Sequence, residues 1–349
     1  EIVSRDWSSD VCSSDLPLST EADIGERLSK RKALPIFSSD AISSSAYATE
    51  EILRVLVLGG AAALALGLEV SIAIAILLVA VAISYRQVCL AYPTGGGSYS
   101  VSKRNLGRRV SLIAASALMI DYIMTVAVST TSAVEQITSA LPELSDSRVL
   151  IGVAAIFLIT LGNLRGLREA GNIFALPTYL FAGSTLAMIA IGAFRIAVLG
   201  EHGDFPAEAA ARATEPLGWI LLLRAFAAGA VALSGTEAIA TGVPAFKPPE
   251  AKNAAATLTA MAILLGVLFI GISYLAVNLG IVHDELTGAT VISQVARAVY
   301  GSDTLPFYLF QAFTAVVLSL VVGIEVFKRY ILNAPTAWIF DANNMLYGT

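Results

Sequence analysis

LPIFSSDAISSSAYATEE, the stretch from Leu34 to Glu51, places five serines and three acids within a segment that is otherwise apolar. Continued to Leu58, the segment is long enough to cross the roughly 30 Å hydrocarbon core of a bilayer as a helix. A charged side chain at the centre of a bilayer costs at least about 2.5–3.5 kcal/mol. Asp40 therefore has to be buried in protein or to face a water-filled path. The stretch predicts a membrane helix with a functional role for Asp40.

The rest of the chain continues the apolar pattern. Its 349 residues are 56% hydrophobic and only 14% charged, whereas soluble domains average about 25% charged residues. This composition, with a net charge of −5, argues against soluble, disordered and nucleic-acid-binding proteins. We predict an all-α membrane protein with about eight transmembrane helices. They lie at about residues 34–58, 68–91, 109–138, 149–164, 171–199, 217–246, 253–282 and 304–326.

The loops between these segments differ in positive charge. One alternating set carries thirteen Lys and Arg residues, and the other carries only Arg148, Arg195, Arg212 and Arg297. Cytoplasmic loops carry the excess of positive charge. We therefore expect a multi-pass protein of the plasma or inner membrane, with residues 1–32 as a cytoplasmic N-terminal segment.

The two ends of the chain do not fit this pattern. Residues 1–16 are Ser-rich, with neither a helical period nor the order of a signal peptide, and we expect them to be artefactual. Residues 327–349 follow a clean apolar helix with a mixed, aromatic sequence that is anomalous for a membrane protein. We therefore expect the chain to be truncated at its C-terminus.

The first span combines Asp40 with hydroxyl groups. Asp40 and Tyr47 are seven residues apart and share one face of a helix. Because serine side chains compete for backbone hydrogen bonds, a break in the helix is expected here, which would free carbonyl groups. Close helix packing on small residues is the alternative; it accounts for the serines but not for Asp40.

The third span carries a second acid. Asp121, Thr125 and Ser129 are spaced by four residues, so they form one oxygen-bearing stripe along a helix, with Tyr122 at its border. A buried aspartate capped by a neighbouring helix is the alternative interpretation.

The sixth span contains a third acid in a weakened helix. Helix-breaking residues surround it, namely Gly235, Gly242 and Pro244. Ser234 and Glu237 are three residues apart and can point the same way. The alternative is an ordinary kinked helix in which Glu237 pairs with Arg224, but thirteen residues of continuous helix would separate them by about 20 Å.

Asp40, Asp121 and Glu237 lie among hydroxyl groups within apolar spans, and no basic residue is expected at a comparable depth in the membrane. This pattern indicates a cation pathway. Carboxylates in an apolar setting are stabilised by a bound cation or by protonation. Oxygen ligands without sulfur or imidazole suit alkali ions or protons. The two histidines, His202 and His283, are isolated in the sequence, which argues against a histidine-based site. Glu50 and Arg54 read as an ion pair on a helix surface.

The sequence offers no sign of catalysis or of a resident cofactor. The glycine-rich segment from Pro93 to Tyr99 lacks the Gly-Lys-Ser/Thr ending of a phosphate-binding loop. No nucleophile–base pair stands out either, so we expect the chain not to be an enzyme.

Several motifs resemble a known family. YPTGGGSY from Tyr92 to Tyr99, and NLRG from Asn163 to Gly166, resemble signatures of the amino acid–polyamine–organocation (APC) transporter superfamily. The opening stretch from Leu34 to Glu51, with SGTEAI from Ser234 to Ile239 and GVPAF from Gly242 to Phe246, resembles the KimA-type potassium importers, relatives of the KUP potassium–proton symporters. The resemblance covers about residues 33–322.

The resemblance implies a LeuT-like APC fold with two inverted five-helix repeats, broken at spans one and six. Residues 33–199 would form the first repeat, and residues 200–326 an incomplete second repeat with spans six to eight. It also implies potassium uptake coupled to protons. Ser234 replaces the usual threonine of the family. The positions that match its potassium site are Asp40, Tyr47, Asp121, Tyr122, Thr125, Ser129, Ser234 and Glu237.

Other functions stay open. Glu237 is our candidate for the proton-linked acid, because an apolar setting favours the neutral form of a carboxyl group. An amino acid permease of the same superfamily is the first alternative, although it would need glycines at the break in span one, and none lies between Leu34 and Leu58. A non-transporting sensor or an inactive fragment is the second. The expected partners are potassium, protons and the lipid bilayer, with a homodimer as a further candidate.

Overall fold

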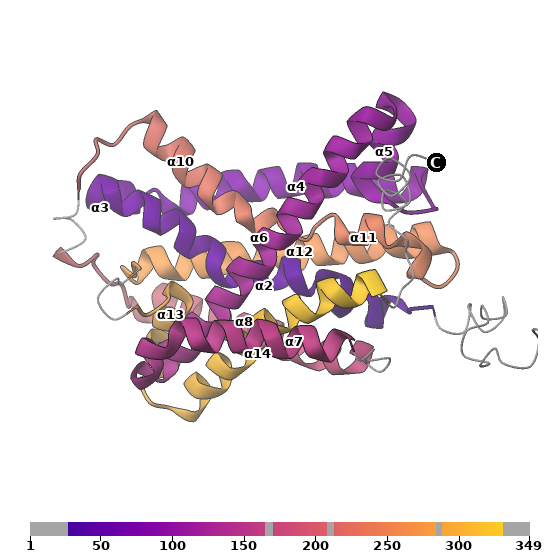
Figure 1. Cartoon of the computed structure of the whole chain (residues 1–349). Helices are drawn as coiled ribbons and strands as arrows, with labels where there is room; N and C mark the ends of the chain where they lie inside the picture. The colour runs from indigo at the N-terminus through magenta and orange to yellow at the C-terminus, as the bar shows by residue number, and fades with distance from the viewer. Residues whose placement is uncertain (1–26, 165–169, 208–212, 284–287, 331–349) are drawn as a thin grey trace, which may run out of the picture.

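The computed structural model describes residues 27–164, 170–207, 213–283 and 288–330, and within these ranges it is helical without a strand (Figure 1). Only an isolated β-bridge joins Leu28 to Phe246 in the described chain. The long helices are α2 (Lys30–Leu56), α4 (Gly67–Ala91), α6 (Arg108–Ala140), α7 (Arg148–Leu164), α8 (Ala170–Leu199), α12 (Glu250–Asn278) and α14 (Leu305–Tyr330). The short ones are η1 (Val57–Gly59), α3 (Gly60–Leu64), α5 (Gly97–Leu106), η2 (Pro142–Ser147), α10 (Trp219–Gly229), η3 (Ala230–Leu233), α11 (Ala238–Thr241), η4 (Val243–Ala245) and α13 (Val291–Tyr300).

The helices confirm the predicted class. Each of the eight predicted spans contains helix, and the sixth is divided among α10, η3, α11 and η4. Among the described residues, four helices are long and apolar enough to cross a membrane: α4, α6, residues 175–199 of α8, and α12. The serines and acids of α2 lower its hydropathy although its 27 residues are long enough. An all-helical membrane architecture is therefore established, while the number of crossings and the repeat boundaries stay predictions.

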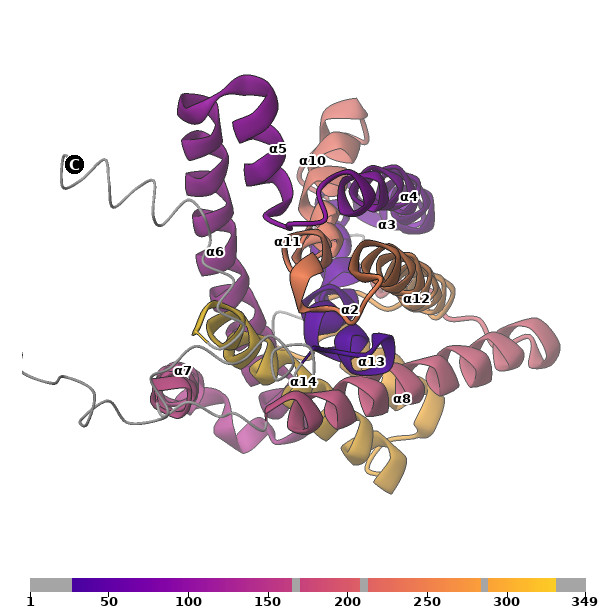
Figure 2. The same ribbon diagram turned by 90° about the vertical axis from the view of Figure 1, so that its right-hand side faces the viewer.

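Helix α2 occupies the middle of the bundle. In the view in which α4 and α12 are seen end-on, α2 and α11 lie centrally, with α4, α12, α8, α14 and α6 around them (Figure 2). Every residue of α2 from Pro35 to Glu50 is buried. Burial on all sides explains why serine and alanine are frequent here, because small side chains allow neighbouring helices to approach closely.

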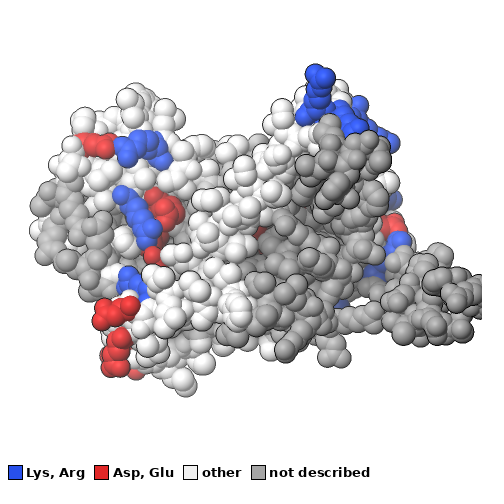
Figure 3. Space-filling view, in the orientation of Figure 1, with Lys and Arg blue, Asp and Glu red and all other residues white. Residues whose placement is uncertain are grey.

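The two ends of the bundle carry different charges. Lys and Arg gather around α5 and the start of α6, with a smaller acidic patch below them, whereas the other end shows several acidic and basic side chains together (Figure 3). We call the first the basic end; it holds the starts of α2, α5, α6 and α12, with Lys32, Lys103, Arg108 and Lys252. A backbone hydrogen bond joins two segments at this end: Leu28 N, before α2, donates to Ala245 O, before α12 (2.8 Å). This separation matches the alternation of charged loops in the sequence.

Several predictions lie outside the described residues. They concern residues 1–26, which include the segment expected to be artefactual, residues 331–349 of the anomalous tail, and Arg165 and Arg168 of the loop after α7.

Candidate functional site

The sixth span is interrupted where the sequence predicts weakness. The α-helix α10 tightens into η3, which ends at Leu233, and the chain resumes an α-helix only at Ala238. Between them lie four non-helical residues, Ser234 to Glu237. Gly235 adopts a φ of 76°, a left-handed conformation that glycine takes without steric cost. The predicted break in span six is therefore confirmed.

The break expected in the first span is wrong. Lys30–Leu56 is one continuous α-helix. Three of the five serine hydroxyls bend back onto carbonyls one turn earlier: Ser43 Oγ donates to Asp40 O (2.9 Å), Ser44 Oγ to Ala41 O (2.7 Å) and Ser45 Oγ to Ile42 O (2.7 Å). These bonds use carbonyls that already belong to the helix and leave its backbone pairing intact. The buried hydroxyls of Ser38 and Ser39 make no hydrogen bond to the described residues. The polar serines are accommodated inside a helix that is buried on all sides.

Helix α2 meets the break of span six at Asp40. The Asp40 side chain is 1% exposed. A Cβ atom placed on Gly235 would lie 2.5 Å from Asp40 Oδ2 and 2.9 Å from Ala41 N, so only glycine fits at this point. One turn further along, Ser44 Oγ donates to Ala232 O (3.1 Å). The two spans are therefore in direct contact at the predicted acid.

Helix α6 adds hydroxyl groups from a third direction. The hydroxyls of Thr125 and Ser234 lie 3.0 Å apart, which ties α6 to the break. Ser129, one turn along the same stripe, is fully buried and lies beside the Tyr47 hydroxyl of α2. Tyr47 also interacts electrostatically with Asp40. The oxygens of α2, α6 and the break thus gather in one buried region.

The other two residues of the α6 prediction are less enclosed. Asp121 is exposed and stands between the exposed side chains of Ile120 and Met124, while Tyr122 is half-buried. Asp121 nevertheless interacts electrostatically with the hydroxyls of Tyr47 and Tyr85. Asp121 therefore lies at the edge of the buried cluster of oxygen atoms and not inside it.

Glu237 lies on the basic-end side of the break, directly before α11. Its side chain is 6% exposed, and it interacts electrostatically with the Tyr85 hydroxyl of α4. The alternative pairing with Arg224 is wrong, because Arg224 Nη1 binds Glu215 Oε2 at 2.7 Å. The break therefore contacts Asp40 at Gly235 and ends with the buried acid Glu237.

Reasoning from the sequence did not recognise the roles of two residues in this region, Gly235 and Tyr85. Gly235 was treated only as a helix breaker, although it makes room for Asp40. Tyr85 lies in the second span, and its hydroxyl is 3.3 Å from Ser98 Oγ. A tyrosine followed by Arg86 near the end of an apolar span was the available signal, but it looks the same as an ordinary residue of the membrane boundary.

A buried charge network occupies the end opposite the basic end. Glu50, read from the sequence as part of a surface pair, is 2% exposed. Its carboxylate binds Arg54 Nη2 (2.9 Å) and His283 Nδ1 (2.6 Å), and it accepts from Val291 N (3.2 Å). Glu51 and Glu135 also bind Arg54, so they are not simply solvated. His283 is isolated only in the sequence, since the fold brings it to Glu50.

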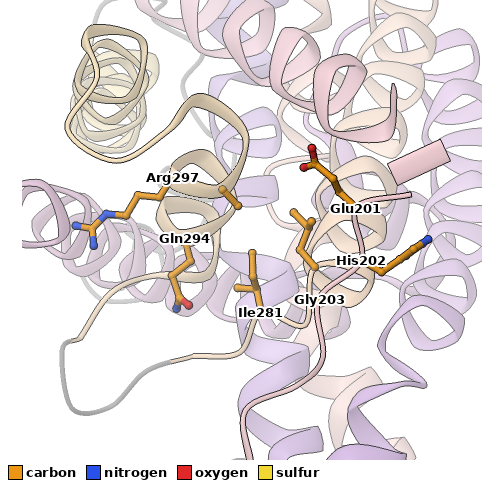
Figure 4. A pocket seen from close by; sticks show the side chains of 8 residues that line it. Glu201, His202, Gly203, Ile281, Gln294 and Arg297 are labelled. Carbon is orange, nitrogen blue, oxygen red and sulfur yellow. The ribbon is translucent and has the colours of Figure 1, made fainter. Parts of the chain in front are cut away.

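A surface cavity of about 460 Å³ at the same end lies apart from the predicted site (Figure 4). It is lined by residues around Glu201, Ile281 and Gln294. Its polar groups are already engaged: Glu201 Oε2 pairs with Arg195 Nη2 (2.7 Å), and Gln294 Nε2 donates to Val282 O (2.7 Å). We therefore place the candidate site at the break and not in this cavity.

The sequence of the chain is similar to known permeases over most of its length. A family model described as amino acid permease matches residues 28–337. The chain belongs to the amino acid permease family. It is also 43% identical, over 323 residues, to the potassium transporter KimA of Bacillus subtilis (strain 168). That match covers 91% of this chain and 52% of KimA, so the chain spans about half the length of the curated relative.

Membership in this family confirms three predictions. The chain is an APC-type integral membrane protein with a resemblance to KimA, and it is not an enzyme. The LeuT-like arrangement of repeats and the role of each site residue stay predictions.

Proposed function

We propose that the protein takes up potassium together with protons, and that the ion binds at the break of span six. The observation that carries this proposal is the contact between Asp40 and Gly235, which places a buried carboxylate against an irregular backbone segment. Irregular backbone inside a membrane protein is tolerated where it is buried in protein or lines a water-filled cavity, and the buried carboxylate beside it favours the second role here. The similarity to a potassium transporter supports the same ion.

The chemistry of the donors suits an alkali cation. Potassium must exchange its hydration shell for protein oxygens before it crosses the apolar core, and hard oxygen ligands serve this purpose. Hydroxyls of Thr125 and Ser234 are 3.0 Å apart beside the break. We propose Asp40 as the charged ligand, and the neutral oxygens of Tyr47, Ser129, Thr125 and Ser234 as the others, with Asp121 and Tyr122 guiding the ion from the side.

Glu237 is the candidate for coupling to protons. It is the last residue of the break, two residues after Gly235, and it is buried and interacts electrostatically with the Tyr85 hydroxyl. A buried carboxyl group is held more easily when it is neutral. Protonation of Glu237 would therefore reduce the charge of the site when the ion is bound, and would couple the two movements.

An amino acid permease is the alternative, because the family description names that activity. Such permeases bind a substrate carboxylate with freed N–H groups at a break in span one. In this chain α2 is continuous, so its N–H groups are used within the helix. The carboxylate of Asp40 would in addition repel an anionic group.

The experiment measures rubidium uptake in a strain deficient in potassium uptake, with the protein expressed from its complete gene. We expect Asp40→Asn to lose uptake and Glu237→Gln to lose its dependence on a proton gradient. Glu143→Gln serves as the control, because Glu143 is an exposed acid in η2. Full proton-driven uptake by Glu237→Gln would refute its role. Accumulation of labelled amino acids without rubidium would favour the permease, and rubidium binding without uptake would favour a sensor.

The proposal includes an orientation. The basic end would face the cytoplasm of a plasma or inner membrane, because positively charged loops are retained there. Surface labelling of a single cysteine near Lys103 in intact cells tests this, with no labelling expected. The homodimer and the LeuT-like repeats are further predictions that uptake experiments do not address.

A further inference from the structure

The triple-glycine loop before α5 is fitted to the short helix α11. Gly95, Gly96 and Gly97 all have positive φ, at 76°, 86° and 48°. Gly96 N donates to Thr241 O, at the end of α11 (3.1 Å). A Cβ on Gly95 would lie 2.6 Å from Thr241 O, and one on Gly97 would lie 2.7 Å from Thr241 Oγ1. Both backbone conformation and space therefore require glycine here.

Thr241 connects this loop to the candidate site. Its backbone N donates to Glu237 O (3.0 Å), and its Oγ1 donates to the same carbonyl (3.1 Å). Helix α11 has only four residues, Ala238–Thr241. So short a helix is not stable alone, because its nucleation costs more than its few hydrogen bonds return. The position of Glu237 therefore depends on what holds α11.

A second contact holds the chain that follows α11. Leu28 N donates to Ala245 O (2.8 Å), and Lys247 N donates to Leu28 O (3.0 Å), which makes a single β-bridge opposite Phe246. The Phe246 ring stacks on Phe37 of α2 with centroids 5.4 Å apart. Arg27 and Glu250 form an ion pair beside the bridge. Residues 238–247 thus bond to the glycine loop at Thr241 and to the segment before α2 at Ala245 and Lys247. Helix α11 contacts α5 and α2 (Figure 2), and it also packs against α12 and α4, as η4 does against α12.

We propose that these two contacts form a clasp, made of Gly95–Gly97 with Thr241 and of Leu28 with residues 245–247, which closes the ion path at the basic end. The clasp opens to release the ion and closes again around α11, so Gly95, Gly97 and Thr241 are positioning residues for Glu237. This inference rests on the proposed transport function.

The protein contains its own reporter for the clasp. Cys89 of α4 is fully buried, in the same hydrophobic cluster as Phe37, Ile239 and Phe246. Opening the clasp removes part of its cover. Cysteines other than Cys89, Cys12 among them, are replaced by serine, and the rate of maleimide labelling of Cys89 is then measured on the protein in detergent.

Two alanine variants separate the contact from backbone strain. Gly97→Ala pushes against Thr241 Oγ1, whereas Gly107→Ala has a more strongly positive φ, 84° against 48° for Gly97, but nothing lies within 4 Å of its Cβ. We expect Gly97→Ala to label Cys89 at least about tenfold faster than Gly107→Ala, a change of about 1.4 kcal/mol in the closing equilibrium. Thr241→Ala in the same chain should restore slow labelling, because it removes the opposing hydroxyl. Gly95→Ala should not be rescued, since it meets the backbone oxygen of Thr241.

A milder variant covers the case in which Gly97→Ala does not fold. Arg27→Gln removes an ion pair whose two side chains are 25% and 32% exposed, so folding should survive, and we expect labelling to rise about threefold. Equal labelling rates in Gly97→Ala and Gly107→Ala overturn the clasp. Fast labelling that persists when Thr241→Ala is added to Gly97→Ala also overturns it. If Gly97→Ala is unfolded, an unchanged labelling rate in Arg27→Gln overturns it.

Uptake distinguishes this inference from the proposed function. In the Cys12→Ser parent, absence of rubidium uptake defeats the proposed function, while the labelling rates still test whether the clasp covers Cys89. Where the parent transports, Gly97→Ala should lower the maximal uptake rate more than it changes the apparent KM for rubidium, because the ligands themselves are intact. If Gly97→Ala changes the apparent KM for rubidium but not the maximal uptake rate, that result contradicts the clasp and leaves the proposed transport function standing.

Discussion

The contact between Gly235 and Asp40 leads to a quantitative prediction for Gly235→Ala. The new Cβ would lie 2.5 Å from Asp40 Oδ2, 2.7 Å from Asp40 Cγ and 2.9 Å from Ala41 N. These separations are well below van der Waals contact, and the backbone atom of a buried helix cannot move aside. Overpacking of this kind costs about 1–3 kcal/mol, and the left-handed φ of 76° costs an L-residue a further ~1–2 kcal/mol.

The expected free-energy cost of Gly235→Ala is therefore about 2–5 kcal/mol. Part of it lowers the free energy of unfolding, and part of it weakens ion binding. If the protein stays folded, Asp40 must shift away from the break, and a shift that removes about 1.4 kcal/mol of binding weakens the apparent affinity for rubidium tenfold. We expect uptake by Gly235→Ala to fall at least about tenfold at low rubidium concentration. Uptake is measured in cells, and the melting temperature is measured on the purified protein in detergent.

Gly107→Ala is the matched control for this prediction as well. Gly107 also has a positive φ, of 84°, but open space surrounds the position of its Cβ. It carries the cost of the backbone conformation without the contact to Asp40. Wild-type uptake by Gly235→Ala would refute the reasoning, and so would an equal loss in both variants, because strain alone would then account for it.

Three further predictions concern contacts around the site. Thr125→Val and Ser234→Ala should each raise the apparent KM for rubidium by roughly threefold to tenfold, since a hydrogen bond contributes about 0.5–1.5 kcal/mol; the double variant should lose less than the sum of the two single losses, and strictly additive losses would contradict the 3.0 Å hydroxyl contact. Glu50→Ala should destabilise the protein by about 1–3 kcal/mol, because it leaves His283 and the backbone N of Val291 without their buried carboxylate, while Arg54 keeps Glu51 and Glu135; a melting temperature within error of wild type would count against the network. Phe37→Ala should cost about 3–5 kcal/mol of unfolding free energy, because it removes the ring stacked on Phe246; a denaturation midpoint unchanged from wild type would show that the stack contributes little.

Prediction from sequence succeeded where the signal was local. A glycine and an acid within one apolar span indicated a weak helix, and the four non-helical residues from Ser234 to Glu237 bear this out. The same local reasoning, applied to the serines of α2, wrongly predicted a break in that helix. A serine hydroxyl can either compete with a helical hydrogen bond or add to one, and the buried, closely packed setting of α2 decides for the second.

The prediction for α6 was correct only in part, for a similar reason. A spacing of four residues places Asp121, Thr125 and Ser129 on one face, but it does not say how much of that face is covered. Thr125 and Ser129 are buried against α2 and the break, whereas Asp121, about one turn from Thr125 and slightly more than two turns from Ser129, is exposed. Coverage depends on which helices pack alongside, and that information is spread over the whole chain.

The sequence by itself determined that this is an all-helical integral membrane protein with acids at membrane depth, and it identified the family. Hydropathy, helix length and motif spacing are properties of short segments, so they can be read without knowing the fold. Only the tertiary structure decided that Asp40 rests against Gly235, that Glu50 meets His283, and that three glycines hold α11 through Thr241. Each of these contacts joins residues more than a hundred positions apart, and such pairs are chosen by the packing of the complete bundle and not by any local preference.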